Sequence, residues 1–193
     1  MDLTQSTQKE KKARAKKMML WFGIVSLLMA FAGWTSAYIV SSSREDWSQD
    51  LELPSSLYLS AFVILLSSIT YILAKRAIKL GNSKQCTSWL VATLVLGVLF
   101  IVLQFNGFSQ MITLGQYFTG PSSNIKSSYI YVFVLAHIVH VVVGIISLLV
   151  VLFNQIKGKY SADEFLGLSL GATFWHFLDL LWIYLVLFMT FVR

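Results

Sequence analysis

The sequence predicts an all-α membrane protein, a polytopic bundle of five transmembrane helices with a cytoplasmic N-terminus and a periplasmic C-terminus. Composition is the first observation: 56% of the 193 residues are hydrophobic, only 12% are charged, and the mean hydropathy is +0.70. A soluble domain has about 45–50% apolar and about 25% charged residues. The other two observations are five long stretches with almost no charge, and basic residues that gather on one side of those stretches.

Each of the five stretches is long enough to cross a bilayer, for which a helix needs roughly 20 apolar residues. The predicted spans are approximately 18–40, 54–75, 88–108, 128–154 and 164–192. They form one transmembrane domain, 18–193, which follows a basic cytoplasmic tail, 1–17. A water-soluble enzyme and a sizeable extramembrane domain are therefore excluded. The single cysteine, Cys86, allows no intramolecular disulfide and no thiolate metal site.

The first two stretches contain residues that suit packing between helices in lipid. The first carries small residues, which let helices approach closely, and these are Gly23, Ala30, Ala32, Gly33, Ser36 and Ala37. The second has Pro54 near its start, where proline costs a helix little. Its hydroxyl groups can bond to the backbone or to a neighbouring helix, and they belong to Ser60, Ser67, Ser68 and Thr70.

The later stretches differ in how they end. The third begins near Ser88 and loses its apolar character after Phe105, so residues 106–120 are interpreted as an extended helix end and an outside loop that closes at Pro121. Gly158 lies in a short basic turn between the fourth and fifth stretches. We therefore expect these two helices to be antiparallel neighbours.

The distribution of charge sets the predicted orientation. Twelve basic residues lie on the side of the N-terminus, and they are Lys9, Lys11, Lys12, Arg14, Lys16, Lys17, Lys75, Arg76, Lys79, Lys84, Lys157 and Lys159. Only Arg44, Lys126 and Arg193 lie on the other side, together with the acidic residues Glu45, Asp46, Asp50 and Glu52. Cytoplasmic loops accumulate Lys and Arg. The net charge of +6 and the pI near 9.5 thus reflect membrane orientation, and no nucleic-acid partner is predicted.

The candidate chemistry lies in the fourth and fifth stretches. His137 and His140 belong to the fourth, and His176 and Asp179, the only acid inside a span, belong to the fifth. Each pair is spaced by three residues and so shares a helix face. Because the helices are antiparallel and all four residues lie near mid-depth, we expect the two pairs to meet.

Three interpretations of this polar cluster stay open on the residues alone. Two histidines from two helices could ligate a haem, Asp179 could titrate in a proton or ion path, or the cluster could simply join the two helices. There is no third metal ligand at matching depth and no pair of broken half-helices typical of transporters. Trp175 and Trp182 lie mid-span, seven residues apart, on one face near Asp179.

The order of these residues resembles subunit III of the haem-copper terminal oxidases of the cytochrome c oxidase type. Residues 136–140, Ala-His-Ile-Val-His, followed by Gly144, are similar to that family's His-x-x-His helix. Residues 172–182, which contain Trp-His-Phe-Leu-Asp-Leu-Leu-Trp, resemble its long closing signature. The Leu-Gln element ends at Gln104, and Ser26 with Gly33 fits the first helix of the short bacterial form with five spans.

The resemblance implies a non-redox supporting subunit in the bacterial inner membrane. Such a subunit packs against subunit I, binds structural phospholipids, and supports proton uptake and the durability of turnover in aerobic electron transport. Haems and copper belong to partner subunits I and II, and a small subunit IV and a respiratory supercomplex are compatible with the resemblance. We therefore expect no catalytic, cofactor-binding or metal-binding residue in this chain. His137, His140, His176 and Asp179 then form a structural cluster.

Two departures and several alternatives accompany the resemblance. Leu27 and Gly107 stand where the family has buried glutamates, so a role that needs either carboxylate does not carry over. The corresponding subunit of a quinol oxidase or of a nitric oxide reductase complex fits the same residues. A small b-type cytochrome or a transporter that uses the three histidines and Asp179 is the alternative from a different class.

Overall fold

The computed structural model describes residues 8–44, 47, 53–120, 123–162 and 164–192. The helices in this part are α1 (Gln8–Ser41), α2 (Ser55–Lys79), α3 (Ser83–Thr113), α4 (Ile125–Ile156) and α5 (Leu166–Phe191). Each is long and apolar enough to cross a membrane, which confirms the predicted all-α fold with five spans. The acidic loop residues 45, 46, 50 and 52, Pro121 and Arg193 lie outside the described residues.

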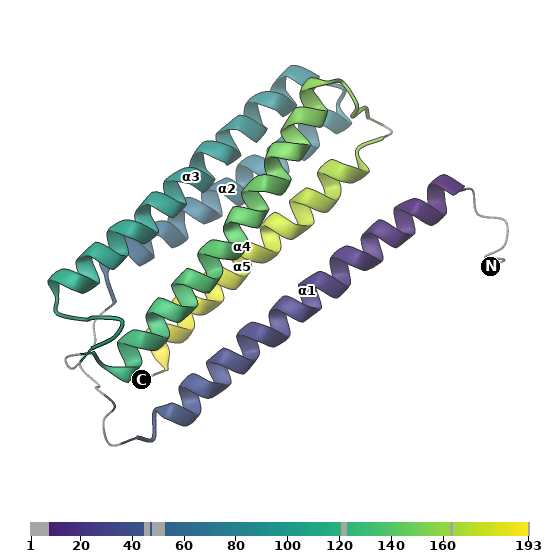
Figure 1. Ribbon diagram of the computed structural model, residues 1–193. Coiled ribbons are helices and arrows are strands. Elements are labelled where there is room, and N and C mark those ends of the chain that lie inside the picture. The colour runs from purple at the N-terminus through teal and green to yellow at the C-terminus, as the bar shows by residue number, and fades with distance from the viewer. Residues whose placement is uncertain (1–7, 45–46, 48–52, 121–122, 163, 193) are drawn as a thin grey trace.

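Helices α2 to α5 form a four-helix bundle, and α1 lies along its side (Figure 1). Around the bundle, α2 contacts α3, α3 contacts α4, α4 contacts α5, and α5 contacts α2. Among the described residues, α1 contacts only α4 and α5. It buries few side chains of its own, namely Ile24, Phe31, Thr35 and Tyr38. The bundle therefore positions the candidate site, and α1 is a peripheral helix.

The turn after α4 makes α4 and α5 antiparallel neighbours, as predicted. Gly158 has a positive φ of 68°, a conformation that favours glycine because it has no Cβ. Its N–H donates to Gln155 O at 3.0 Å, and the N–H of Lys159 donates to Asn154 O at 3.1 Å. These two bonds close the helix end in the Schellman arrangement, which frees the chain to reverse direction.

Four helices, α1 to α4, extend beyond their predicted spans, and α1 and α3 extend furthest. α3 continues from Phe105 to Thr113, which confirms the extended helix end. α1 begins at Gln8, so residues 8–17 of the basic tail continue the first span as helix. This segment is rich in Lys, Arg and Ala, which are good helix formers even without apolar periodicity.

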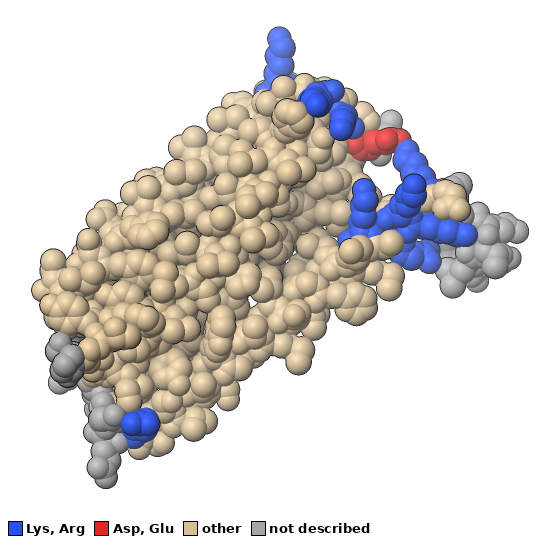
Figure 2. Space-filling model, viewed as in Figure 1, with Lys and Arg blue, Asp and Glu red and all other residues tan. Residues whose placement is uncertain are grey.

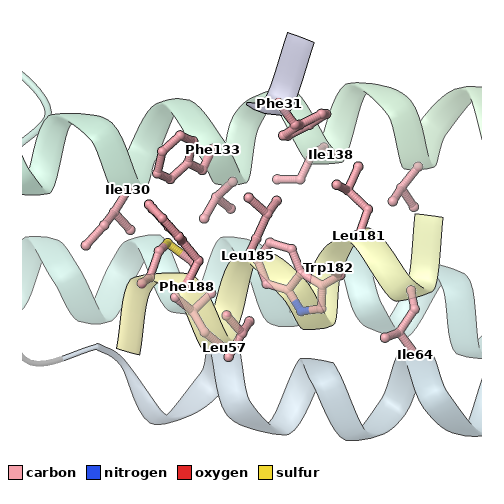
Figure 3. Close-up of a cluster of buried hydrophobic side chains, with 14 of the residues drawn as sticks. Phe31, Leu57, Ile64, Ile130, Phe133, Ile138, Leu181, Trp182, Leu185 and Phe188 are labelled. Carbon is pink, nitrogen blue, oxygen red and sulfur yellow. The ribbon is translucent and has the colours of Figure 1, made fainter. Parts of the chain in front are cut away.

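The apolar core extends between the bundle helices along most of their length. One cluster is centred on Trp182, Leu185 and Phe133 and includes Phe31 of α1. Figure 3 shows Trp182 and Leu185 of α5 between the ribbons of α4 and α2, with Phe31 reaching the α4 side. A second cluster surrounds Trp175. Both signature tryptophans are thus core residues.

Charged side chains gather at one end of the molecule. Figure 2 shows Lys and Arg together at the end that holds the first turns of α1 and the α2–α3 and α4–α5 turns, with little charge along the helices. The long uncharged surface between the two ends fits a bilayer, whose core is about 30 Å thick. The chain is therefore a multi-pass membrane protein.

Candidate functional site

Two tryptophans of α5 donate hydrogen bonds to two serines of α2. Trp175 Nε1 donates to Ser67 Oγ at 3.0 Å, and Trp182 Nε1 donates to Ser60 Oγ at 3.1 Å. Each serine hydroxyl itself donates to the backbone carbonyl three residues earlier, at 2.7 Å. The two tryptophans are seven residues apart, and so are the two serines. Two turns of α2 therefore lie beside two turns of α5. We call Trp175, Trp182, Ser60 and Ser67 the tryptophan–serine ladder.

The ring of Trp175 is enclosed by glycines of two further helices. A Cβ added to Gly97 of α3 would lie 2.8 Å from Trp175 Cη2. A Cβ added to Gly144 of α4 would lie 2.8 Å from Leu178 Cδ1 and 3.4 Å from Trp175 Cε3. The absence of a side chain at both positions lets two backbones approach the indole. Trp175 therefore joins α2, α3, α4 and α5 at one point.

Trp182 packs against aromatic rings on the other side of the ladder. His137 of α4 stacks on it with ring centroids 4.9 Å apart and an interplanar angle of 27°, and Phe100 of α3 meets it edge-on at 5.4 Å. Gln104 Nε2 donates to Ser60 Oγ at 2.9 Å. His137 is fully buried, and neither ring nitrogen has a hydrogen-bond partner among the described residues. The contacts of His137 are thus those of a core ring.

Ser68 of α2 connects His176 and Asp179 of α5. Its hydroxyl donates to Asp179 Oδ2, and its oxygen lies 2.8 Å from His176 Nδ1. One serine side chain of α2 therefore bonds to both groups of α5. This network joins α2 and α5 next to the ladder.

His140 faces the peripheral helix. Its Nδ1 lies 2.6 Å from the backbone carbonyl of Ala136 and donates to it, because a carbonyl can only accept. The imidazole also meets Phe31 of α1 edge-on, with centroids 5.6 Å apart. His140 therefore contributes to the contact between α4 and α1.

The structure places the four predicted polar residues in separate contacts. His176 and Asp179 come together through Ser68, whereas His137 contacts the ladder and His140 contacts α1. The two pairs were expected to meet, but they lie in separate contacts because of the rotation of α4 about its own axis. Val141, and no histidine of α4, lines the small void beside Asp179.

Sequence reasoning named the serines of α2 as hydrogen-bonding residues but did not assign their partners. The available signal was the shared seven-residue spacing of Ser60 and Ser67 with Trp182 and Trp175. Within the described ranges, no three His, Cys, Asp or Glu side chains are grouped as metal ligands. The tryptophan–serine bonds, the Ser68 bonds and the ring contacts instead connect helices to one another.

Five spanning helices, four of which meet at a buried tryptophan–serine network, define the class, a multi-pass membrane protein whose signature residues are packing residues. The family model for "Cytochrome c oxidase subunit III" matches residues 18–192. The chain belongs to this family, which confirms the resemblance found in the sequence. It is accordingly a subunit III of the haem-copper oxidase type and part of a multisubunit oxidase complex.

Relatives of known name support the same family. The chain is 28% identical over 184 residues to "Cytochrome bo(3) ubiquinol oxidase subunit 3" of Buchnera aphidicola, covering 93% of this chain and 88% of the relative. It is 30% identical over 167 residues to the protein of the same name in Pseudomonas aeruginosa, covering 84% and 78%. "Cytochrome c oxidase subunit 3" of Spodoptera frugiperda is 29% identical over 130 residues, covering 66% and 82%.

Proposed function

We propose that this chain is the non-redox subunit III of a proton-pumping haem-copper terminal oxidase in a bacterial plasma membrane, with the N-terminus of α1 in the cytoplasm. It packs beside subunit I, supports proton uptake and turnover, and leaves haem and copper to subunits I and II. A small subunit IV and a supercomplex are further proposed partners. The observation that carries the proposal is the tryptophan–serine ladder, in which the signature residues of the family join four helices.

The proposed role of the membrane-embedded polar residues is structural. His176 and Asp179 bond to α2 through Ser68, His137 stacks on Trp182, and His140 contacts α1. Each contact joins two helices, and an interhelical hydrogen bond such as those of Ser68 contributes on average about 0.6 kcal/mol. Their sum supports a fixed arrangement of the five spans on which partner subunits can assemble.

Purification of the whole complex tests this function. We expect a tag on this chain to recover subunits I and II together with haem and copper, and the chain separated from them to carry neither. An absorbance spectrum that showed stoichiometric b-type haem on the separated chain would refute the proposal in favour of a cytochrome. Recovery of the chain without any oxidase subunit would refute it as well.

A ubiquinol oxidase is the second candidate for the parent complex. It is favoured by the two bacterial relatives with that name, because the chain covers 88% and 78% of their lengths. The electron donor is set by other subunits, chiefly by whether subunit II holds copper. Oxygen uptake by the purified complex with reduced cytochrome c or with ubiquinol, together with copper analysis of subunit II, distinguishes the two.

Phospholipid binding is a further part of the proposal. A pocket of about 530 Å³ lies between the first turns of α1 and the α4–α5 turn, and the residues lining it include Lys12, Lys16, Lys159 and Tyr160. Burial raises the pKa of the Tyr160 phenol, which therefore stays a neutral hydrogen-bond donor at pH 7. A fourth lysine, Lys9, also lines the pocket and pairs with Glu164. The other three lysines and the phenol fit the phosphate of an anionic lipid.

A further inference from the structure

The first turns of α1 have little hold on the bundle. All buried side chains of α1 lie from Ile24 onward, and from Gln8 to Met19 every side chain is exposed except that of half-buried Ala13. Lys9 pairs with Glu164 of the α4–α5 turn, but both side chains are largely exposed, at 74% and 59%. An exposed ion pair stabilises a fold only slightly. Apolar packing therefore does not explain why this end of α1 lies beside the turn.

The pocket between these turns of α1 and the α4–α5 turn is rich in positive charge. Lys12 and Lys16 line it from α1, and Lys159 lines it from the turn. Lys9, Lys12 and Lys16 are spaced by three and four residues, so they share one face of α1. Figure 2 shows the end of the molecule where these basic side chains gather. We call this space the lysine pocket.

Three of the four lysines that line the lysine pocket are uncompensated. Lys9 pairs with Glu164, whereas Lys12, Lys16 and Lys159 have no ion pair within the described part of the chain. A space of about 530 Å³ is roughly 10 Å across, which is about one Debye length at 0.1 M salt. Lysines of α1 and of the turn therefore repel each other across the pocket. Without a counter-ion, this repulsion opposes the contact of α1 with the turn.

We propose that a ligand with two negative charges on phosphate groups occupies the lysine pocket and joins the first turns of α1 to the α4–α5 turn. The bound phosphate attracts Lys12 and Lys16 on one wall and Lys159 on the other. It thus replaces a repulsion between the two walls by an attraction of both walls to one group. The position of this end of α1 then depends on whether the ligand is bound.

The number of uncompensated lysines favours two negative charges. A phosphodiester carries one, which leaves two of the three lysines without a partner. A phosphomonoester carries about −1.5 to −2 at pH 7, and two phosphodiesters in one headgroup together carry two. Lysine ammonium groups bind phosphate oxygens as point charges, and the neutral phenol of Tyr160 in the same pocket can donate one more hydrogen bond. A ligand of this class therefore balances the charge on both walls.

A lipid headgroup is the source that the position of the pocket favours. The uncharged stretch of α1 begins at Met18, two residues after Lys16, so the lysine pocket lies at the level of the headgroups of a bilayer. Soluble pyrophosphate offers the same phosphate chemistry from the aqueous side. The inference rests on the proposed function, because it specifies the charge of the bound phospholipid and adds that its phosphate joins α1 to the bundle.

Cross-linking of α1 to the α4–α5 turn in the whole complex tests the proposal. Lys9→Cys and Glu164→Cys together remove one charge of each sign, so the net charge of the pocket is unchanged. The two side chains meet and are exposed, so a short bismaleimide joins them when α1 lies beside the turn, while the native Cys86 is buried. The complex is reconstituted in phosphatidylcholine alone, with phosphatidic acid, with phosphatidylglycerol at equal total charge, or with soluble pyrophosphate.

We expect cross-linking to be at least threefold faster with phosphatidic acid, a phosphomonoester, than in phosphatidylcholine alone or with phosphatidylglycerol, a phosphodiester. The same gain with pyrophosphate in phosphatidylcholine would support the phosphate bridge and identify a soluble anion as its source. Equal rates under all four conditions would overturn the proposal. An equal gain with phosphatidylglycerol would overturn it as well, because the second negative charge would then have no effect.

A pair of lysine substitutions in the same cysteine background tests the repulsion. Lys12→Gln with Lys16→Gln should cross-link faster than the parent in phosphatidylcholine and lose the response to phosphatidic acid. The matched control, Lys11→Gln with Lys17→Gln, removes two exposed charges of the same segment that do not line the pocket, and it should respond like the parent. Loss of the response in both variants would overturn the proposal. If the chain purifies with an oxidase but cross-linking ignores the anion, only this inference fails; if no oxidase subunit copurifies, the proposed function fails.

Discussion

Replacement of Gly144 by leucine should separate α4 from α5 and destabilise the bundle. A Cβ at this position would already lie 2.8 Å from Leu178 Cδ1 and 3.4 Å from Trp175 Cε3, and leucine adds three more carbons to the same contact. Overpacking of a core typically costs about 1–3 kcal/mol. Trp175 cannot retreat, because Ser67 holds its indole nitrogen and Gly97 lies against its far edge. We therefore expect the upper end, about 3 kcal/mol, which is roughly a 150-fold change in the unfolding equilibrium.

Detergent unfolding of the purified chain, followed by tryptophan fluorescence and circular dichroism, measures this loss. Gly33→Leu in α1 is the matched control, because nothing lies within 4 Å of a Cβ added at Gly33. Gly144→Ala should fall between the two variants, since its single added carbon meets the flexible end of Leu178. Equal midpoints for Gly144→Leu and Gly33→Leu would refute the reasoning that a glycine slot encloses Trp175.

Three further predictions concern the polar groups. Asp179→Asn keeps an acceptor for Ser68, so helix pairing and oxygen reduction should be nearly unchanged. Loss of proton pumping in a fully assembled complex would instead place Asp179 in a conduction path. Ser67→Ala leaves a buried indole N–H without its acceptor, which costs about 1–3 kcal/mol, and wild-type stability in detergent unfolding would contradict the ladder. Lys159→Gln should lower the amount of anionic phospholipid that mass spectrometry finds in the complex, whereas Lys84→Gln, outside the pocket, should leave it unchanged.

The sequence predicts the fold well because membrane insertion depends on properties that are local in the chain. Long uncharged stretches identify all five spans, and Gly158 identifies the reversal between α4 and α5. The helical start of α1 at Gln8 is not predicted, since a charged segment carries no hydropathy signal for helix. Hydropathy therefore does not predict helix in segments that form it independently of the membrane.

The site is predicted only within single helices. A spacing of three residues shows that His176 and Asp179 share a face, but it does not show which helix that face meets. The rotation of α4 decides that Val141 lies beside Asp179 while His137 lies on Trp182. That rotation is set by close contacts such as the one at Gly144, which involve residues distant in sequence. A single sequence therefore predicts which residues belong to the site better than it predicts which residues of other helices they contact.

The two departures from the family pattern fit a packing role for this chain. A Cβ added to buried Gly107 would lie 3.1 Å from Leu57 Cδ2, so a glutamate there would require the Leu57 side chain to shift. Leu27 is half-buried on α1, where an apolar side chain suits both the bundle and the lipid. Asp179 is the one acid left inside a span, and its carboxylate bonds to Ser68. The chain therefore has no carboxylate at these two positions, and the tryptophan–serine ladder joins its bundle helices, which fits the proposed role of a subunit that contributes through its shape and the surfaces that it offers to its partners.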